Sequence, residues 1–92
     1  MIQTVVKRDG RVVGYNEEKI KAAIRKAMLQ TEAGEDESLI QRIADRISTR
    51  GRNQMSVEDI QDQVELELMK SPRKEVARGY IRYRQKRSVA RK

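Results

Sequence analysis

The dipeptide Asp9-Gly10 stands between two short runs of β-forming residues near the start of the chain. The runs cover residues 4–8 and 11–15. Asp-Gly in such a setting is the strongest short-range signal for a β-hairpin, because a two-residue turn needs positive φ at both central positions. A hairpin alone is only marginally stable in water, so it must pack on other elements. The N-terminal segment is therefore predicted to be a small sheet that covers the rest of the molecule.

The predicted turn also decides which side chains face each other across the hairpin. A two-residue turn pairs Arg8 with Arg11, Lys7 with Val12, and Val6 with Val13. Because side chains alternate along a strand, the two faces then carry Val6, Val13 and Tyr15 on one side, and Val5, Lys7 and Val12 on the other. Both faces hold apolar residues, so one is predicted to pack on helices and the other to cover a further group.

After the hairpin, apolar residues recur at intervals of three and four, which predicts helices. Four helix starts are indicated by an N-capping side chain or a first-turn proline, at Asn16, Asp36, Ser56 and Ser71-Pro72. The stretch 52–55 is compatible with a short strand or a loop. The chain is therefore predicted to be of the α+β class, with a small N-terminal β-hairpin or sheet as a lid on a four-helix bundle.

Two glycines have an expected structural meaning. Gly51 is the predicted C-terminal stop of the second helix. Gly79 lies inside the fourth helix, at a cost of ~1 kcal/mol relative to alanine. It either permits close approach of another element or is simply a tolerated weak position.

The composition excludes several kinds of chemistry. The chain has 92 residues, predicted to form one domain (1–92), and it has no Cys and no His. It therefore lacks zinc ribbons, thiol nucleophiles and imidazole acid–base groups. No carboxylate pair stands out either, so we expect no catalytic residue, no metal ligand and no enzyme activity. Apolar runs fall short of the ~20 residues of a membrane span and no signal peptide is evident, so a cytoplasmic location is expected.

Positive charge is concentrated at the C-terminal end. The net charge is +7, and residues 73–92 hold nine Lys or Arg and one acid, whereas residues 1–72 are close to neutral. Such a segment attracts polyanions such as nucleotide phosphates, nucleic acid or an acidic protein face. A solvated helix face is the simpler interpretation, and charge alone favours it.

Two places near the N-terminus are candidates for binding phosphate. The turn 7–11 brings three cations close to turn amides, which suits an anion, although Lys and Arg are also common on exposed strands. The helix that begins at Asn16 presents free amides, with Lys19 one turn further on. The acids at positions 17–18 would repel an anion there and fit ordinary helix capping better.

The end of the fourth predicted helix is a third candidate. Tyr80, Tyr83 and Lys86 follow one another at intervals of three. Aromatic rings among cations can stack a base and bind phosphate. The alternative is that the cations are solvated and both tyrosines belong to the core, and for the tyrosines this second interpretation is favoured.

Two parts of the sequence resemble the signature of the ATP-cone family. The first part is Val6-Lys7-Arg8-Asp9-Gly10 followed by Tyr15-Asn16-Glu17-Glu18-Lys19-Ile20, and the second is Val76-Ala77-Arg78-Gly79-Tyr80-Ile81-Arg82-Tyr83-Arg84. Between them, Gly51-Arg52-Asn53-Gln54 and Val64-Glu65-Leu66-Glu67-Leu68-Met69 are similar to the cones of anaerobic (class III) ribonucleotide reductases. The resemblance covers essentially the whole chain, although the family often has Pro-Phe where this chain has Gly14-Tyr15.

The resemblance implies that ATP or dATP binds between the hairpin and the helices. The residues implied to contact the nucleotide are Lys7, Arg8, Val12, Val13, Gly14, Tyr15, Lys19, Val57, Gln61 and Lys86. The four cations among them would hold phosphates, and Val57 and Gln61 would face the base or the ribose. Mg²⁺ bound together with the nucleotide is compatible with this site.

A regulatory function follows from the same resemblance. The family's cones are activity switches of ribonucleotide reductases, in which ATP favours the active enzyme and dATP inhibits it, often through a changed oligomeric state. The two effectors differ by one 2′-hydroxyl, so differential contacts must supply the coupling, and Gln61 is the candidate for the ribose contact. The expected partners are ATP or dATP, the catalytic domain of a reductase and, in some states, a second copy of the chain.

Three other functions remain open at this stage. One is an ATP cone of a nucleotide-responsive transcriptional repressor, although such proteins carry a Cys-rich zinc ribbon before the cone. Another is a basic nucleic-acid-binding module that uses residues 73–92, with affinity that falls steeply with salt. The last is an interaction module that docks on a larger enzyme and binds no nucleotide. Nucleic acid and membranes are the less expected partners.

Overall fold

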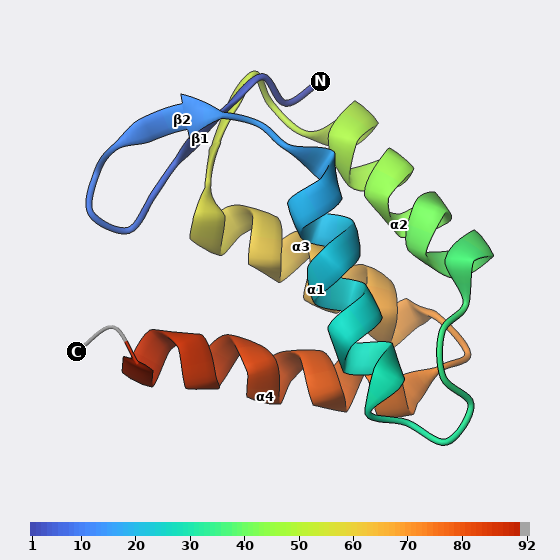
Figure 1. Cartoon of the computed structure of the whole chain (residues 1–92). Coiled ribbons are helices and arrows are strands. Elements are labelled where there is room, and N and C mark those ends of the chain that lie inside the picture. The colour runs from blue at the N-terminus through green and yellow to red at the C-terminus, as the bar shows by residue number, and fades with distance from the viewer. Residues whose placement is uncertain (91–92) are drawn as a thin grey trace.

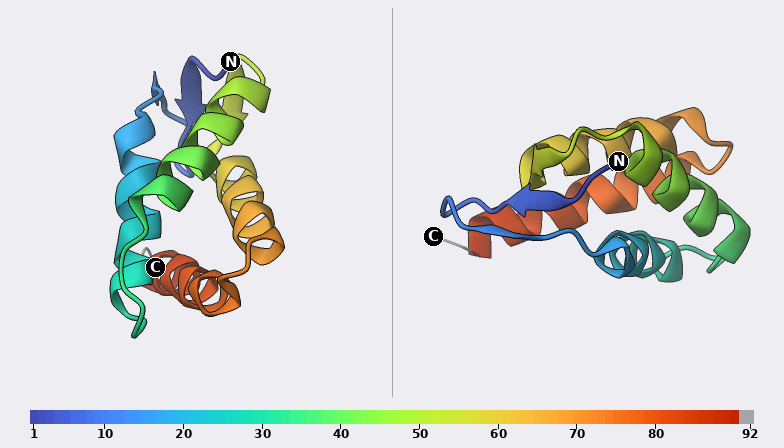
Figure 2. Two further views of the ribbon diagram at one scale, coloured as in Figure 1. Left: turned by 90° about the vertical axis from the view of Figure 1, so that its right-hand side faces the viewer. Right: turned by 90° about the horizontal axis from the view of Figure 1, so that it is seen from above.

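The computed structural model describes residues 1–90, and the side chains of residues 1–86. Its elements are β1 (Thr4–Val6), β2 (Val12–Gly14), α1 (Glu17–Leu29), α2 (Glu37–Arg50), β3 (Gln54–Ser56), α3 (Val57–Lys70) and α4 (Lys74–Ala90). The sheet and α4 lie at opposite edges of the molecule, and α1 and α3 run between them on two sides (Figures 1 and 2). The predicted α+β class, a small sheet on four helices, is confirmed.

The sheet has one strand more than the hairpin. Its order is β2-β1-β3, and β3 pairs with β1 in parallel, with Val5 opposite Met55. The stretch that the sequence left as strand or loop is therefore partly a strand. A parallel pairing across some fifty residues leaves no local mark in the sequence, because its partner comes from tertiary packing.

The hairpin turn differs from the prediction. The register pairs Val5 with Val13 and Val6 with Val12, one residue away from the predicted pairing. Lys7 N donates to Arg11 O at 2.7 Å, and Gly10 has φ of +90°, while within residues 1–90 no residue other than glycine has positive φ. This is a three-residue loop closed by a left-handed glycine, the next most common hairpin after the two-residue turns. The prediction of a two-residue turn is therefore wrong.

Asp9 accounts for the longer loop. Its carboxylate accepts hydrogen bonds from the Arg11 backbone N at 3.1 Å and from Arg11 Nε at 2.8 Å. An aspartate that bonds the backbone two residues on stabilises such a turn without entering the left-handed region. Only Gly10 needs positive φ here.

Because of the shift of one residue, the side chains of β1 lie on the opposite face, relative to those of β2, from the one predicted. Val5 is buried and packs with Val13 on the helix side, whereas Val12 lies on the outer face and is 55% exposed. The prediction that Val6 and Val13 share a face is wrong for the same reason.

Helix starts were predicted best where a side chain caps the helix. Asn16, Asp36 and Ser56 each accept a hydrogen bond from a first-turn backbone N–H, at 3.0–3.1 Å. The prediction for α4 was wrong, because the helix begins at Lys74 and not at Ser71-Pro72. Ser71 instead caps the end of α3, where its Oγ donates to Leu68 O at 2.6 Å.

Gly51 ends α2 as predicted, but for a different reason. Its φ is −70°, so no left-handed conformation is required. A Cβ at this position would lie 2.2 Å from Ile2 Cγ1. Glycine is therefore needed because the Ile2 side chain packs directly against this position.

The core is formed by the predicted apolar stripes. Ile24 and Met28 of α1, Ile40 of α2, Leu68 of α3 and Val76 of α4 are fully buried. All four helices thus pack around the same interior, with Val5 and Met55 covering it from the sheet.

Gly79 of α4 is a position where the helices approach closely without strain. A Cβ there would lie 3.5 Å from Ala27 O and 3.7 Å from Ala27 Cβ, which is ordinary contact. Gly79→Ala is therefore expected to raise the free energy of unfolding by about 0.5–1 kcal/mol, because alanine loses less conformational entropy on folding than glycine does. Urea unfolding followed by circular dichroism measures this. A loss of stability would show that α1 and α4 cannot accept the added methyl group.

Candidate functional site

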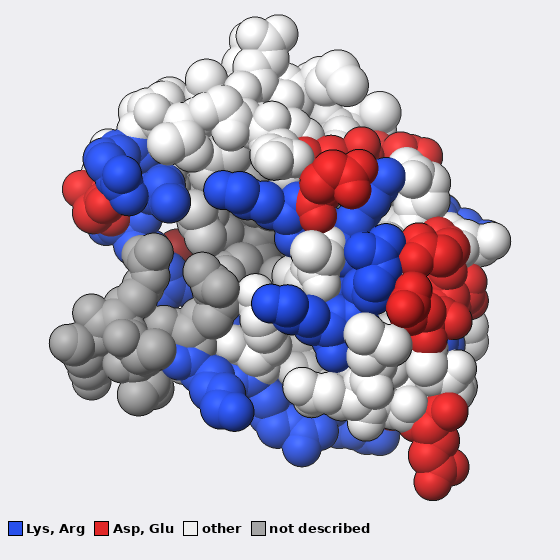
Figure 3. All heavy atoms as spheres, viewed as in Figure 1, with Lys and Arg blue, Asp and Glu red and all other residues white. Residues whose placement is uncertain are grey.

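A cleft of about 390 Å³ opens between the hairpin, α1, the first turns of α3, and α4. Figure 3 shows it as a hollow bordered by Lys and Arg side chains. The apolar part of its lining comes from buried or half-buried residues of every bounding element, including Val5, Ile20, Ile60 and Tyr80. The site is thus a place where the core reaches the surface, with cations at its rim.

All but two of the site residues predicted from the sequence line this cleft. Those that line it are Lys7, Arg8, Val13, Gly14, Tyr15, Lys19, Val57 and Gln61. Val12 does not, because the hairpin register turns it outward. Lys86 is exposed on α4 and lies outside the lining, whereas Tyr83, one turn earlier, lies within it.

Sequence reasoning missed Lys26. It lines the cleft from α1, two turns after Lys19 on the same side of the helix. Between them, Ala22 and Ala23 also line the cleft, and their short side chains leave room for a ligand. The seven-residue interval between Lys19 and Lys26 is visible in the sequence, but nothing local distinguishes Lys26 from Lys21 on the same helix.

The two tyrosines of α4 form part of the floor. Tyr80 is only 3% exposed and Tyr83 is half-buried, with their rings 6.1 Å apart. The favoured interpretation of both as core residues is confirmed for Tyr80, and both also line the cleft. Burial raises the pKa of Tyr80 and that of Tyr15, so these phenols stay protonated at neutral pH.

The charge of the lining is of one sign. Lys7, Arg8, Lys19 and Lys26 line the cleft, and no Asp or Glu does so among residues with described side chains. Within the same residues no cluster of three potential metal ligands exists, and no described helix is long and apolar enough to cross a membrane. A cleft lined by cations attracts an anion.

Arg8 is held at the cleft by α3. Its Nη2 donates to Gln61 Oε1 at 3.0 Å, and its Nε lies 3.3 Å from the Glu58 carboxylate. Gln61 Oε1 also accepts from Arg84 Nε at 3.1 Å, and Arg84 pairs with Asp62 at 2.8 Å. Because guanidinium groups only donate, the amide oxygen of Gln61 must face both arginines, and its NH₂ is left to donate to a ligand.

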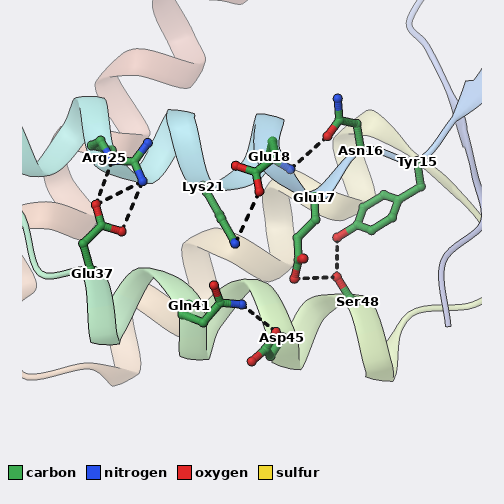
Figure 4. A network of polar contacts seen from close by, with 10 residues as sticks. All are labelled: Tyr15, Asn16, Glu17, Glu18, Lys21, Arg25, Glu37, Gln41, Asp45 and Ser48. Atoms are coloured by element: carbon green, nitrogen blue, oxygen red, sulfur yellow. Dashed lines mark hydrogen bonds and ion pairs between the residues drawn. The ribbon is translucent and has the colours of Figure 1, made fainter.

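Tyr15 is fixed from the opposite side. Its hydroxyl lies 2.6 Å from Ser48 Oγ on α2, and Ser48 Oγ donates to Glu17 Oε1 at 3.3 Å (Figure 4). Glu18 pairs with Lys21 at 3.5 Å. Neither acid lines the cleft, and each has a partner within the protein.

A small sheet on four helices around a cationic, tyrosine-lined cleft defines a binding module for an anion with an apolar or aromatic part. Comparison with known families agrees: the model of the ATP cone domain matches residues 3–89. The chain belongs to the ATP-cone family.

Several proteins that are similar to this chain are ribonucleotide reductases. The chain is 40% identical over 93 residues to the anaerobic ribonucleoside-triphosphate reductase of Escherichia coli (strain K12) and 43% identical over 99 residues to the vitamin B12-dependent ribonucleoside-diphosphate reductase of Thermoplasma acidophilum, with 99% of the chain covered in both. The ribonucleoside-diphosphate reductase subunit alpha of Chlamydia pneumoniae is 36% identical over 101 residues, covering 98% of the chain. The resemblance to cones of anaerobic reductases is thus confirmed, and it extends to other reductases.

The matched region is a small part of each relative. The chain spans 13% of the length of the first two reductases and 10% of the third. The similarity therefore concerns the cone and not the rest of these enzymes.

Proposed function

We propose that this chain is an allosteric module that binds ATP or dATP and regulates a ribonucleotide reductase without catalysis of its own. The observation that carries the proposal is the cleft itself, which joins four cations to an apolar, tyrosine-containing floor. A nucleoside triphosphate has the matching parts, a polyanion and a flat aromatic base. Family membership and the reductase relatives support the same function.

The phosphates are proposed to bind at the cationic rim. Lys7 and Arg8 approach from the hairpin, and Lys19 and Lys26 from α1. Lys86 stays a prediction as a further phosphate contact from the exposed side of α4. Because no described carboxylate lines the cleft, Mg²⁺ is expected to bind to the phosphates and not to the protein.

Gln61 is proposed to distinguish ATP from dATP. The two arginines bond to its side-chain oxygen, so its NH₂ group can donate to a ligand. A ribose 2′-hydroxyl can accept this hydrogen bond. A contact made by one effector and not the other can supply a coupling of ~1–3 kcal/mol, whereas equal binding regulates nothing. Val57, in the same turn region of α3, would contact the base or ribose.

The proposed partners follow from the relatives. The proposed regulated partner is the catalytic domain of a reductase, and the proposed location is the cytoplasm. Inhibition is proposed to act through a change of oligomeric state. The relatives named above are all reductases, which favours this function over a transcriptional repressor. A nucleic-acid module is less favoured because the cleft is a concave site and not a continuous basic face.

Calorimetric titration with ATP, dATP and GTP tests the proposal. ATP and dATP are expected to bind saturably, more tightly than GTP, and to keep measurable affinity at moderate salt. Binding to DNA or RNA that falls steeply with salt, together with no saturable ATP binding, would support the nucleic-acid module instead. Absence of binding to every nucleotide would leave the interaction module as the explanation.

A further inference from the structure

We propose that Ser48 is a positioning residue for the cleft: it holds the ring of Tyr15 in the cleft wall, and nucleotide binding is transmitted to α2 through this hydrogen bond. The inference rests on the proposed function, because it concerns how the same cleft is shaped and what senses its occupant. It assigns a role to α2, which contributes no described residue to the cleft lining.

Helix α2 is the one helix of the described residues that contributes no residue to the cleft lining. Tyr15 does line the cleft, and its hydroxyl reaches across to Ser48 Oγ at 2.6 Å (Figure 4). Ser48 is 4% exposed, so this contact is shielded from water. The hydrogen bond therefore joins the cleft wall to an element that no ligand in the cleft would touch.

The donors in this network can be assigned from its chemistry. Glu17 as a carboxylate only accepts, so Ser48 must give its single proton to Glu17 Oε1, 3.3 Å away. Ser48 Oγ can then only accept from Tyr15, whose hydroxyl donates. Removing the Ser48 hydroxyl deprives Tyr15 of this acceptor, and the ring is no longer held at one place in the wall.

Ser48 is also anchored through its backbone. Its carbonyl oxygen accepts from Ile2 N at 3.2 Å, and Tyr15 N donates to Gln3 O at 3.0 Å. The start of the chain, the Tyr15 ring and α2 are thus joined at one residue. A nucleotide that contacts the Tyr15 ring contacts a group that is hydrogen-bonded to α2. The backbone amides of α2 therefore become more protected from hydrogen exchange when the cleft is occupied.

The test uses the full chain, with Ser48→Ala, Tyr15→Phe and the double variant. ATP affinity is measured by calorimetry, and amide hydrogen exchange of α2 is measured with and without saturating ATP. Each single variant is expected to bind ATP about 2- to 10-fold more weakly, as for one lost hydrogen bond, and the double variant no more weakly than either. ATP should slow exchange in α2 of the native chain and leave it unchanged in the variants.

Thr49→Ala is the matched control, because it removes a neighbouring α2 hydroxyl that bonds only within its helix, to Asp45 O at 2.8 Å. It should bind ATP and protect α2 as the native chain does. Unchanged affinity in folded Ser48→Ala, or α2 protection retained in that variant, overturns the inference while the proposed function stands. If Ser48→Ala does not fold, Tyr15→Phe decides by the same two measurements. A native chain that binds no nucleotide overturns both.

Discussion

Replacing Lys7 with alanine is expected to weaken ATP binding by about 1–3 kcal/mol, or roughly 5- to 150-fold, without loss of the fold. Lys7 lines the cleft, and it forms no ion pair within the part of the chain whose side chains are described. Its backbone closes the hairpin loop through Arg11 O and Gly10 N, and alanine keeps both bonds. The variant therefore removes a charge and leaves the turn in place. Calorimetric titration at constant salt measures the change.

Two further variants make this result specific. Lys21→Ala removes a lysine of α1 that pairs with Glu18 at 3.5 Å and does not line the cleft, so its ATP affinity should stay within about 2-fold of native. Lys86→Ala tests a residue that the family resemblance implies but that does not line the cleft. A loss of ATP affinity comparable to that of Lys7→Ala would place a phosphate beyond the lining residues, near the exposed side of α4. Native affinity in Lys7→Ala would reject the cleft as the triphosphate site.

Replacing Ile24 with alanine is expected to lower the free energy of unfolding by about 2–5 kcal/mol. Ile24 is 0% exposed and lies on the inner side of α1, within the cluster of core residues that all four helices share. Alanine removes buried methyl groups and leaves a cavity that a packed core closes only in part. Since a small domain has about 5–15 kcal/mol of stability in total, this is a large fraction of it.

Leu29→Ala provides the comparison on the same helix. Leu29 is 58% exposed at the end of α1, so its loss should change the free energy of unfolding by less than about 1 kcal/mol. Urea unfolding followed by circular dichroism gives both values, and an unchanged dependence on urea would show that the unfolded states are alike. Equal effects of the two substitutions would contradict the arrangement of the α1 core face.

Much of the fold was predictable because it depends on neighbours in sequence. The capping residues Asn16, Asp36 and Ser56 each bond to an amide two or three positions away, so the local pattern is sufficient to find the helix starts. The α4 start was missed where Ser71 serves the preceding helix instead, a choice that depends on how α3 ends. A capping residue can act on either of two helices, and sequence spacing does not say which.

The site was predictable in part for the same reason. Lys7, Arg8 and Lys19 lie beside the two local motifs, the hairpin turn and the first turn of α1, and all three line the cleft. Lys26 carries no such motif. It enters the site only because α1 packs on α4 in an orientation that turns the side with Lys26 to the cleft.

The local sequence pattern is sufficient to predict the hairpin, the four helices and the inward faces of the helices, since periodicity and capping act over a few residues. Tertiary structure decided the hairpin register, the parallel pairing of β3 with β1, and therefore that Val13 and not Val12 faces the cleft. It also decided the contact of Tyr15 with Ser48. These features depend on residues that are far apart in the chain, or on a turn whose alternatives are close in free energy, and only the packed molecule selects among them.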